Sequence, residues 1–243
     1  TLYCKNVSYI LVFLDFAVVA REWAMLNPKA VMHSKETHPF GGPIDLETVL
    51  SSRPIAWPLN LLDCCLVTDH GGAVVIVSKE HATEYKNDPV WIEGSGEAIS
   101  HINMSQMEDM TMTSAHLSSK RAYEIAGMGP KDMEMAMLYD SFTYTAGVTA
   151  EMVGLAPRGE GTNLWKNGLA SPKGKFPINT NGGGLSYSHS GMYGMLLLVE
   201  AQRQLAGKAS GLEGRQTTAK SAIVNGTGGP LASTGTIILT VDR

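Results

Sequence analysis

Residues 179–194, NTNGGGLSYSHSGMYG, decide how the second half of the chain is expected to fold. Three consecutive glycines allow left-handed backbone conformations that other residues adopt only at a cost. The apolar run MLLLVEA follows directly, and its spacing predicts a helix over 191–207. Four side chains fall on one stripe of that helix, which we expect to pack in the core: Met192, Met195, Leu196 and Val199. The stretch is therefore predicted to be a glycine-rich loop that leads into a buried helix.

Periodicity and turn residues predict alternating helices and strands in the rest of the chain. Further helices are expected over four ranges: 13–26, 44–52, 113–127 and 140–154. Strands are expected over five ranges: 71–78 as a buried strand, 90–99, 133–139, and 220–226 with 235–242 as a hairpin. Asp140 is predicted to be the N-cap of the helix that follows it. Helices and strands in this order are typical of a layered α/β fold.

Composition excludes several classes of protein. The chain has 243 residues, of which 44% are hydrophobic and 17% charged, as in a globular protein with a substantial core. A net charge of −4 gives no electrostatic footprint for nucleic acid or an anionic membrane. Cys4, Cys64 and Cys65 are too few for a disulfide framework, and without a C-x-x-C pattern no structural zinc site is expected. Three free thiols fit a reducing cytoplasm, which is the expected location.

The N-terminal region is not expected to enter a membrane. The apolar run over 9–20 is shorter than the ~20 residues that a bilayer span requires, and Asp15 interrupts it. The run also lacks the basic region and the cleavage site of a signal peptide. Because the chain starts at Thr1 inside a segment that resembles ordered structure, we expect a further portion of the protein to precede it.

Three segments offer polar side chains or free backbone N–H groups at strand ends or helix starts: LYDSF at 138–142, NTNGGGLSYSH at 179–189 and NGTGG at 225–229. In α/β sheets, ligands gather where such loops meet. Taken alone, each has a structural explanation, since Asp140 could cap a helix and Tyr139 could be a core tyrosine. The glycines match neither the P-loop nor the dinucleotide pattern, and GLSYS lacks the last glycine of the hydrolase elbow. The combination of segments is therefore more informative than any one of them.

Together these segments resemble the motifs of the thiolase superfamily. NTNGGGLSYSHSGMYG resembles the signature in which Asn-Gly-Gly precedes Gly-His-Pro and a helix, while LYDSF resembles Asn-Glu-Ala-Phe and NGTGG resembles Cys-x-Gly-Gly-Gly. Upstream, LDCCLVTDHGGAVVIVS resembles the Asp-Gly-Ala-Ala strand that closes the N-terminal half of that fold, and RPIAWPLNLLDCC is closer to the lipid-transfer, sterol-carrier-type branch. The resemblance implies a thiolase-like layered αβαβα architecture. Residues 113–243 would form its C-terminal half, and residues 1–112 the loop domain and the end of its N-terminal half.

Several positions depart from the thiolase pattern. Asn225 stands at the position of the late catalytic cysteine, Tyr139 replaces the motif asparagine, and Ser190 replaces the proline after His189. The nucleophilic cysteine of thiolases belongs to the half that this chain lacks. Because an asparagine amide does not titrate, Asn225 cannot remove the α-proton in a Claisen condensation. The pattern resembles the thiolase-like aldolases that cleave a β-hydroxyacyl-CoA side chain from a steroid.

This resemblance implies a retro-aldol reaction on a 3-hydroxyacyl-CoA. Tyr187 would accept the proton of the substrate hydroxyl, and Tyr139 would return a proton to the enolate carbon. His189 is expected to be a neutral imidazole near a helix N-terminus and to hold the thioester oxygen. Four residues are implied to bind the substrate or its oxyanion: Asn225, Gly183, Gly184 and Asp140. No metal or separate cofactor is implied, because coenzyme A belongs to the substrate.

Two other functions remain open from the sequence. The chain could belong to an acetyl-CoA acyltransferase whose nucleophilic cysteine lies in the missing half, or it could be a non-catalytic lipid-binding or scaffold subunit. The resemblance further implies an acyl-CoA substrate and a homo-oligomer or a complementary chain that supplies the N-terminal half. In the aldolase branch it also implies a small partner with a zinc ribbon and an OB-fold.

Overall fold

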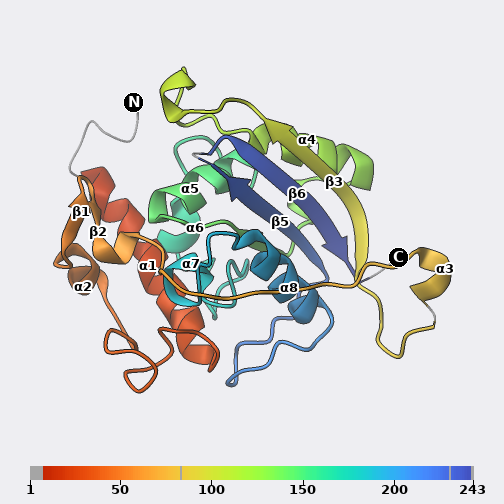
Figure 1. Ribbon diagram of the computed structural model, residues 1–243, viewed down its shortest axis with the longest axis horizontal. Helices are drawn as coiled ribbons and strands as arrows, with labels where there is room; N and C mark the ends of the chain where they lie inside the picture. The colour runs from red at the N-terminus through yellow and green to blue at the C-terminus, as the bar shows by residue number, and fades with distance from the viewer. Residues whose placement is uncertain (1–7, 83, 230, 242–243) are drawn as a thin grey trace.

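Figure 1 shows the computed structural model of the chain, which describes residues 8–82, 84–229 and 231–241, with side chains from residue 13 onward. A four-stranded sheet lies at its centre, in the order β3-β6-β5-β4. The strands are β3 (Trp91–Ile99), β4 (Met135–Leu138), β5 (Ser221–Gly228) and β6 (Ser233–Thr240). β4 and β5 run parallel, whereas β5 with β6 and β6 with β3 run antiparallel. The sheet with helices on both faces confirms the predicted layered α/β fold, including the C-terminal hairpin.

Helix α4 (Ala115–Ala126) covers one face of the sheet at β3 and β6. Its backbone lies so close to β3 that a Cβ added at Gly96 would stand 2.2 Å from the Ser118 carbonyl oxygen. The Ser118 hydroxyl also forms hydrogen bonds of 2.9 Å and 2.8 Å with Thr234 and Thr236 of β6. The helix ends at Gly127, which adopts the left-handed conformation expected of a C-terminal glycine.

Helix α8 (Gly194–Leu205) covers the opposite face, at β4 and β5. The predicted helix is confirmed, but its predicted core stripe is wrong in part, because Met192 is 82% exposed and Met195 is 40% exposed. The side of α8 that meets the sheet is set by other residues. They are buried together with the strands: Leu196, Leu197 and Ala201.

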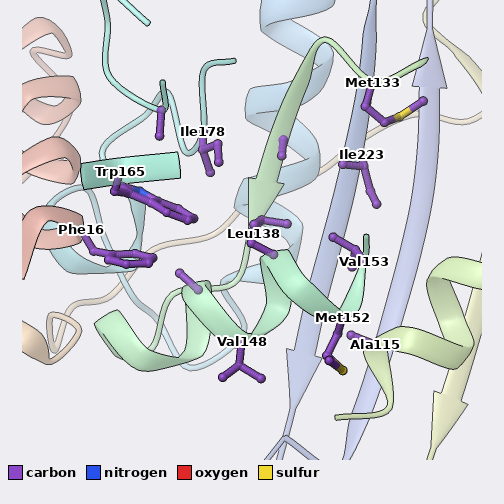
Figure 2. Packing of buried hydrophobic residues seen from close by; sticks show 14 of the residues in the cluster. Phe16, Ala115, Met133, Leu138, Val148, Met152, Val153, Trp165, Ile178 and Ile223 are labelled. Atoms are coloured by element: carbon purple, nitrogen blue, oxygen red, sulfur yellow. The ribbon is translucent and has the colours of Figure 1, made fainter. Parts of the chain in front are cut away.

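A second group of helices packs beside the sheet. It consists of α1 (Ser8–Leu26), α5 (Thr143–Met152) and α6 (Asn163–Lys166). The rings of Phe16 and Trp165 stack with centroids 3.8 Å apart, and Figure 2 shows them beside Leu138 at the end of β4. The Trp23 indole N–H donates to the Ala170 carbonyl oxygen at 2.9 Å, so α1 is fixed to the loop after α6.

The remaining elements are short. They are α2 (Leu46–Leu50), β1 (Pro54–Ala56), β2 (Leu59–Asn60), α3 (Lys79–Ala82), α7 (Gly183–Ser186), and 3-10 turns at Leu61–Asp63, Met104–Gln106 and Pro130–Asp132. Helix α2 lies inside the predicted range 44–52, and the Asp45 carboxylate caps it by accepting from the Thr48 N–H at 2.8 Å. The predicted boundary at residue 112 falls between β3 and α4, which pack against each other, and it stays a prediction.

The predicted buried strand over 71–78 is wrong. In the structure this segment is extended but belongs to no sheet, and Val75 and Ile76 are 83% and 69% exposed. A β-branched run favours an extended backbone, but a strand also requires a neighbour for its hydrogen bonds. Among the residues that the structure describes, no strand pairs with this segment.

None of the helices within the described ranges combines the length and the apolar composition that a membrane span requires.

Candidate functional site

The glycine-rich loop is attached directly to the end of β4. The side chain of Asn179 accepts a hydrogen bond from the Leu138 N–H and donates one to the Leu138 carbonyl oxygen, both at 2.8 Å. Asn179 has a φ of 53°, which asparagine tolerates better than most residues. On the other side, the Tyr139 N–H donates to the Asn225 carbonyl oxygen at 3.1 Å. The segments LYDSF, NTNGGGLSYSH and NGTGG therefore meet at one edge of the sheet, as the sequence predicts.

The Asp140 side chain holds the glycine-rich loop in place by hydrogen bonds and does not cap its own helix. The N-cap of α5 is Phe142, so the predicted N-cap at Asp140 is wrong. The Asp140 carboxylate instead accepts hydrogen bonds from the Gly184 N–H at 2.7 Å and from the Leu185 N–H at 3.4 Å. A Cβ at Gly183 would stand 2.0 Å from Asp140 Oδ2, so only glycine fits above the carboxylate. Asp140, Gly183 and Gly184 thus form the support of the loop.

Burial controls the protonation of this support. Asp140 is 2% exposed, and burial raises the pKa of its carboxyl to about 7, although the hydrogen bonds from Gly184 and Leu185 act in the opposite direction. The charge of the residue that anchors the loop therefore changes near neutral pH.

Tyr139 and His189 lie against each other in a small aromatic cluster. Their rings are perpendicular, with centroids 5.4 Å apart. Tyr193 completes the cluster, at 5.7 Å from Tyr139 and 6.1 Å from His189, and its hydroxyl donates to Asn181 Oδ1 at 2.9 Å. Sequence analysis did not single out Tyr193 or Asn181, although both belong to the quoted stretch, because their contact depends on how the loop closes on itself.

The His189 imidazole has an unused hydrogen-bonding atom. Its Nε2 is buried, and within the described residues it has no hydrogen-bond partner. Burial lowers the pKa of His189, so the neutral imidazole is favoured. The direction agrees with the sequence-based expectation, but the cause is burial, because α8 begins only at Gly194. A neutral imidazole with a free nitrogen can donate one hydrogen bond to a ligand.

A groove of about 790 Å³ opens beside Tyr139. It is lined by the ends of β3 and β5, the start of β6 and the start of α8. Five of its lining residues are glycines: Gly191, Gly194, Gly226, Gly228 and Gly235. Such a volume is within the range of small-molecule sites. Because glycine has no side chain, a ligand here could approach the backbone closely.

Tyr187 is not among the residues that line this groove, and it is 6% exposed. Its hydroxyl is 3.3 Å from Nε2 of His70, a residue that the sequence analysis did not single out. Burial raises the pKa of both Tyr187 and Tyr139, so neutral phenols are favoured. Each phenol can therefore donate a proton or, when it loses its own proton, accept one.

The Asn225 side chain does not join the other predicted site residues. It is fully buried, and its amide nitrogen donates to Thr236 Oγ1 at 2.8 Å. Thr236 in turn contacts Ser118 of α4, on the face of the sheet away from α8. Alternation along β5 explains this, because Val224 packs with the α8 side and the next residue points the other way. The predicted role of Asn225 as an oxyanion donor has no support in this arrangement.

Comparisons with known proteins agree with these motifs. Residues 96–241 match the protein family described as "Thiolase C-terminal domain-like". The steroid side-chain-cleaving aldolase of Thermomonospora curvata is 34% identical over 93% of this chain and 56% of its own length. The acetyl-CoA acetyltransferase of Methanothermobacter thermautotrophicus is 30% identical over 89% of this chain and 55% of its own length.

A solved structure shares the fold. The Ltp2-ChsH2(DUF35) aldolase superposes with a TM-score of 0.81 and 30% identity, over 96% of this chain and 59% of that chain. The chain therefore spans between half and three fifths of the length of these relatives.

Proposed function

Because this chain belongs to the thiolase superfamily, we propose that it forms part of an enzyme that cleaves a carbon–carbon bond of a 3-hydroxyacyl-CoA by a retro-aldol reaction. One observation carries the proposal: His189, whose buried Nε2 has no hydrogen-bond partner among the described residues, lies against Tyr139, which lines the groove. In addition, Asn225 stands where the motif that this chain resembles has its late cysteine. The similarity to the steroid side-chain-cleaving aldolase supports it. Coenzyme A is part of the substrate, and no separate cofactor is proposed.

The reaction needs three side chains, each with its own role. Tyr187 accepts the proton of the substrate hydroxyl as it gives up its own phenolic proton, while the carbon–carbon bond breaks and the bonding electrons pass to the thioester as an enolate. His189 donates a hydrogen bond from its free nitrogen to the thioester oxygen, where negative charge develops. Tyr139 then gives a proton to the enolate carbon. Asp140 and the glycines at 183 and 184 hold the loop that carries Tyr187 and His189.

Acyl transfer is the second candidate, because the archaeal acetyl-CoA acetyltransferase matches over a similar length. That reaction needs a nucleophilic cysteine, which would come from outside this chain. The two reactions differ in their products. A lyase releases a shorter acyl-CoA and a carbonyl compound without adding free coenzyme A, whereas a thiolase consumes it.

We propose that the working enzyme is an assembly in the cytoplasm. The solved aldolase that resembles this chain is named for two components, Ltp2 and ChsH2(DUF35). We propose that the assembly contains a small second protein of the zinc-ribbon and OB-fold type. The rest of it is either a homo-oligomer or a chain that supplies the N-terminal half. Co-purification of the tagged protein from its native host, followed by mass spectrometry, would test this composition.

Substitution of the two tyrosines tests the proposed reaction. In the complete assembly, Tyr187→Phe and Tyr139→Phe should each lower turnover of a 3-hydroxyacyl-CoA by ~100- to 10,000-fold, because each removes one positioned acid–base group. Tyr123→Phe is the matched control, since Tyr123 is also a buried tyrosine but bonds to the Val153 carbonyl oxygen, away from the groove.

The control should change turnover by less than about threefold, since Tyr123 has no role in the proposed transition state. Near-normal turnover in both site variants would contradict the tyrosine mechanism. Acyl-CoA binding without any turnover in the complete assembly would instead favour a non-catalytic subunit.

A further inference from the structure

His70 faces the hydroxyl of Tyr187 from a different part of the chain. The two rings have centroids 5.1 Å apart, and Nε2 of His70 is 3.3 Å from the Tyr187 oxygen. Tyr187 is buried, whereas His70 is exposed. The pair therefore connects a buried phenol to an imidazole that can exchange protons with water.

The segment that leads to His70 is held in place by a series of contacts between residues 65–68 and the site. The Cys65 N–H donates to the Ser141 carbonyl oxygen at 2.9 Å, and the Leu66 N–H donates to the Gly184 carbonyl oxygen at 3.0 Å. These contacts attach the segment to both halves of the site, the loop after β4 and the glycine-rich loop.

Thr68 continues the attachment next to the catalytic histidine. Its hydroxyl accepts from the His189 N–H at 2.9 Å and lies 2.8 Å from the Ser188 hydroxyl. His70 follows two residues later, so the same contacts that hold His189 also bring His70 to Tyr187. This placement does not depend on the His70–Tyr187 contact alone.

Three charged groups on α8 and the loop after it act on Tyr187. Glu200 raises the pKa of the phenol, whereas Arg203 and Arg215 lower it. Tyr193 bonds to Asn181 instead. Glu200 is engaged by the Arg215 guanidinium at 2.6 Å. His70 is therefore the imidazole that lies within hydrogen-bonding distance of the Tyr187 oxygen.

We propose that His70 is a positioning residue that holds the Tyr187 hydroxyl and receives its proton during the reaction. This inference rests on the proposed function. The substrate O–H proton moves to the Tyr187 oxygen as the phenolic proton moves to Nε2 of His70, and the carbon–carbon electron pair forms the enolate. The imidazolium then releases the proton to water, so no oxidant, reductant or further reactant is required.

Two substitutions of His70 separate proton transfer from simple hydrogen bonding. His70→Ala should lower kcat/KM of the complete assembly by roughly 100-fold, as expected for loss of one proton-transfer group. His70→Gln can still accept a hydrogen bond but cannot take up the proton, so it should remain impaired and should lose the limb of the pH profile that His70 causes. His81→Ala is the control, because His81 is an exposed histidine of α3 that pairs with Glu84, and the variant should retain normal activity.

A titration followed by nuclear magnetic resonance provides a readout besides activity. With ring-labelled tyrosine, the Tyr187 signal should shift as His70 titrates in the unsubstituted assembly, and this shift should disappear in His70→Ala. Full activity in His70→Ala or His70→Gln would overturn the inference, as would a Tyr187 signal that ignores the substitution. If Tyr187→Phe abolishes turnover while His70→Ala does not, the relay alone is wrong; if Tyr187→Phe is fully active, the proposed function fails as well.

Discussion

Replacement of Gly183 by alanine would test how Asp140 holds the glycine-rich loop. Gly183 has a φ of 68°, which costs an L-residue about 1–2 kcal/mol. The new Cβ would also stand 2.0 Å from Asp140 Oδ2, so the carboxylate must move. If it moves, the buried N–H of Gly184 loses its acceptor, at a cost of about 1–3 kcal/mol. The expected loss in the free energy of unfolding is therefore about 2–5 kcal/mol from both effects together.

Gly191→Ala is a matched control in the same loop. Gly191 has a φ of 77°, and a Cβ there would meet nothing within 4 Å. It should cost only the backbone part, about 1–2 kcal/mol. Urea unfolding of both variants, compared with the unsubstituted protein, measures the difference. Equal losses would refute the idea that contact with Asp140 makes glycine necessary at 183.

Two further perturbations test the buried charges. Glu200→Gln leaves the Arg215 guanidinium buried without its partner, since both side chains are 3% exposed, and should lower the free energy of unfolding in urea by about 3–5 kcal/mol. Glu124→Gln breaks an exposed pair with Lys120 and should lower it by less than about 1 kcal/mol. Similar losses in the two variants would contradict a special role for burial. The Asp140 carboxyl has its pKa raised from 3.8 to about 7, so the folded state binds more protons than the unfolded state between these values, and stability should fall as the pH rises from about 4 to about 7. Asp140→Asn cannot titrate, and unfolding measured across that range should show a smaller decline; an unchanged decline would show that other groups cause it.

Local signals predicted most of the fold correctly. The helix that ends at Gly127 and the short helix capped by Asp45 depend on contacts within a few residues, and the hairpin of β5 and β6 joins two strands that are neighbours in the sequence. The failure at 71–78 has the opposite origin, because a strand exists only where a second strand lies beside it. Val75 and its neighbours have the composition of a strand, but no partner lies beside them in the described chain.

The site could be predicted only in part, for a similar reason. The motifs correctly placed Tyr139 near His189, because each stands at a strand end or in the loop before a helix. The predicted N-cap role of Asp140 is wrong, because the backbone N–H groups from which its carboxylate accepts belong to a loop 44 residues further along the chain. No local pattern shows that His70 meets Tyr187, which are 117 residues apart. The Asn225 side chain misses the other site residues because it points to the α4 face of the sheet. A shift of one position in β5 would turn it to the opposite face.

Asn179 attaches the glycine-rich loop to the sheet and so limits how far the loop can move. Its amide reproduces, with one side chain, the pair of hydrogen bonds that a neighbouring strand would make to Leu138, and the backbone of 177–179 runs along the same edge of β4. These hydrogen bonds fix which residue of the loop lies beside which residue of the strand. Thermal motion of the loop is therefore coupled to that of the sheet, so the distance between the loop and Tyr139 at the strand end should fluctuate far less than loop composition alone suggests.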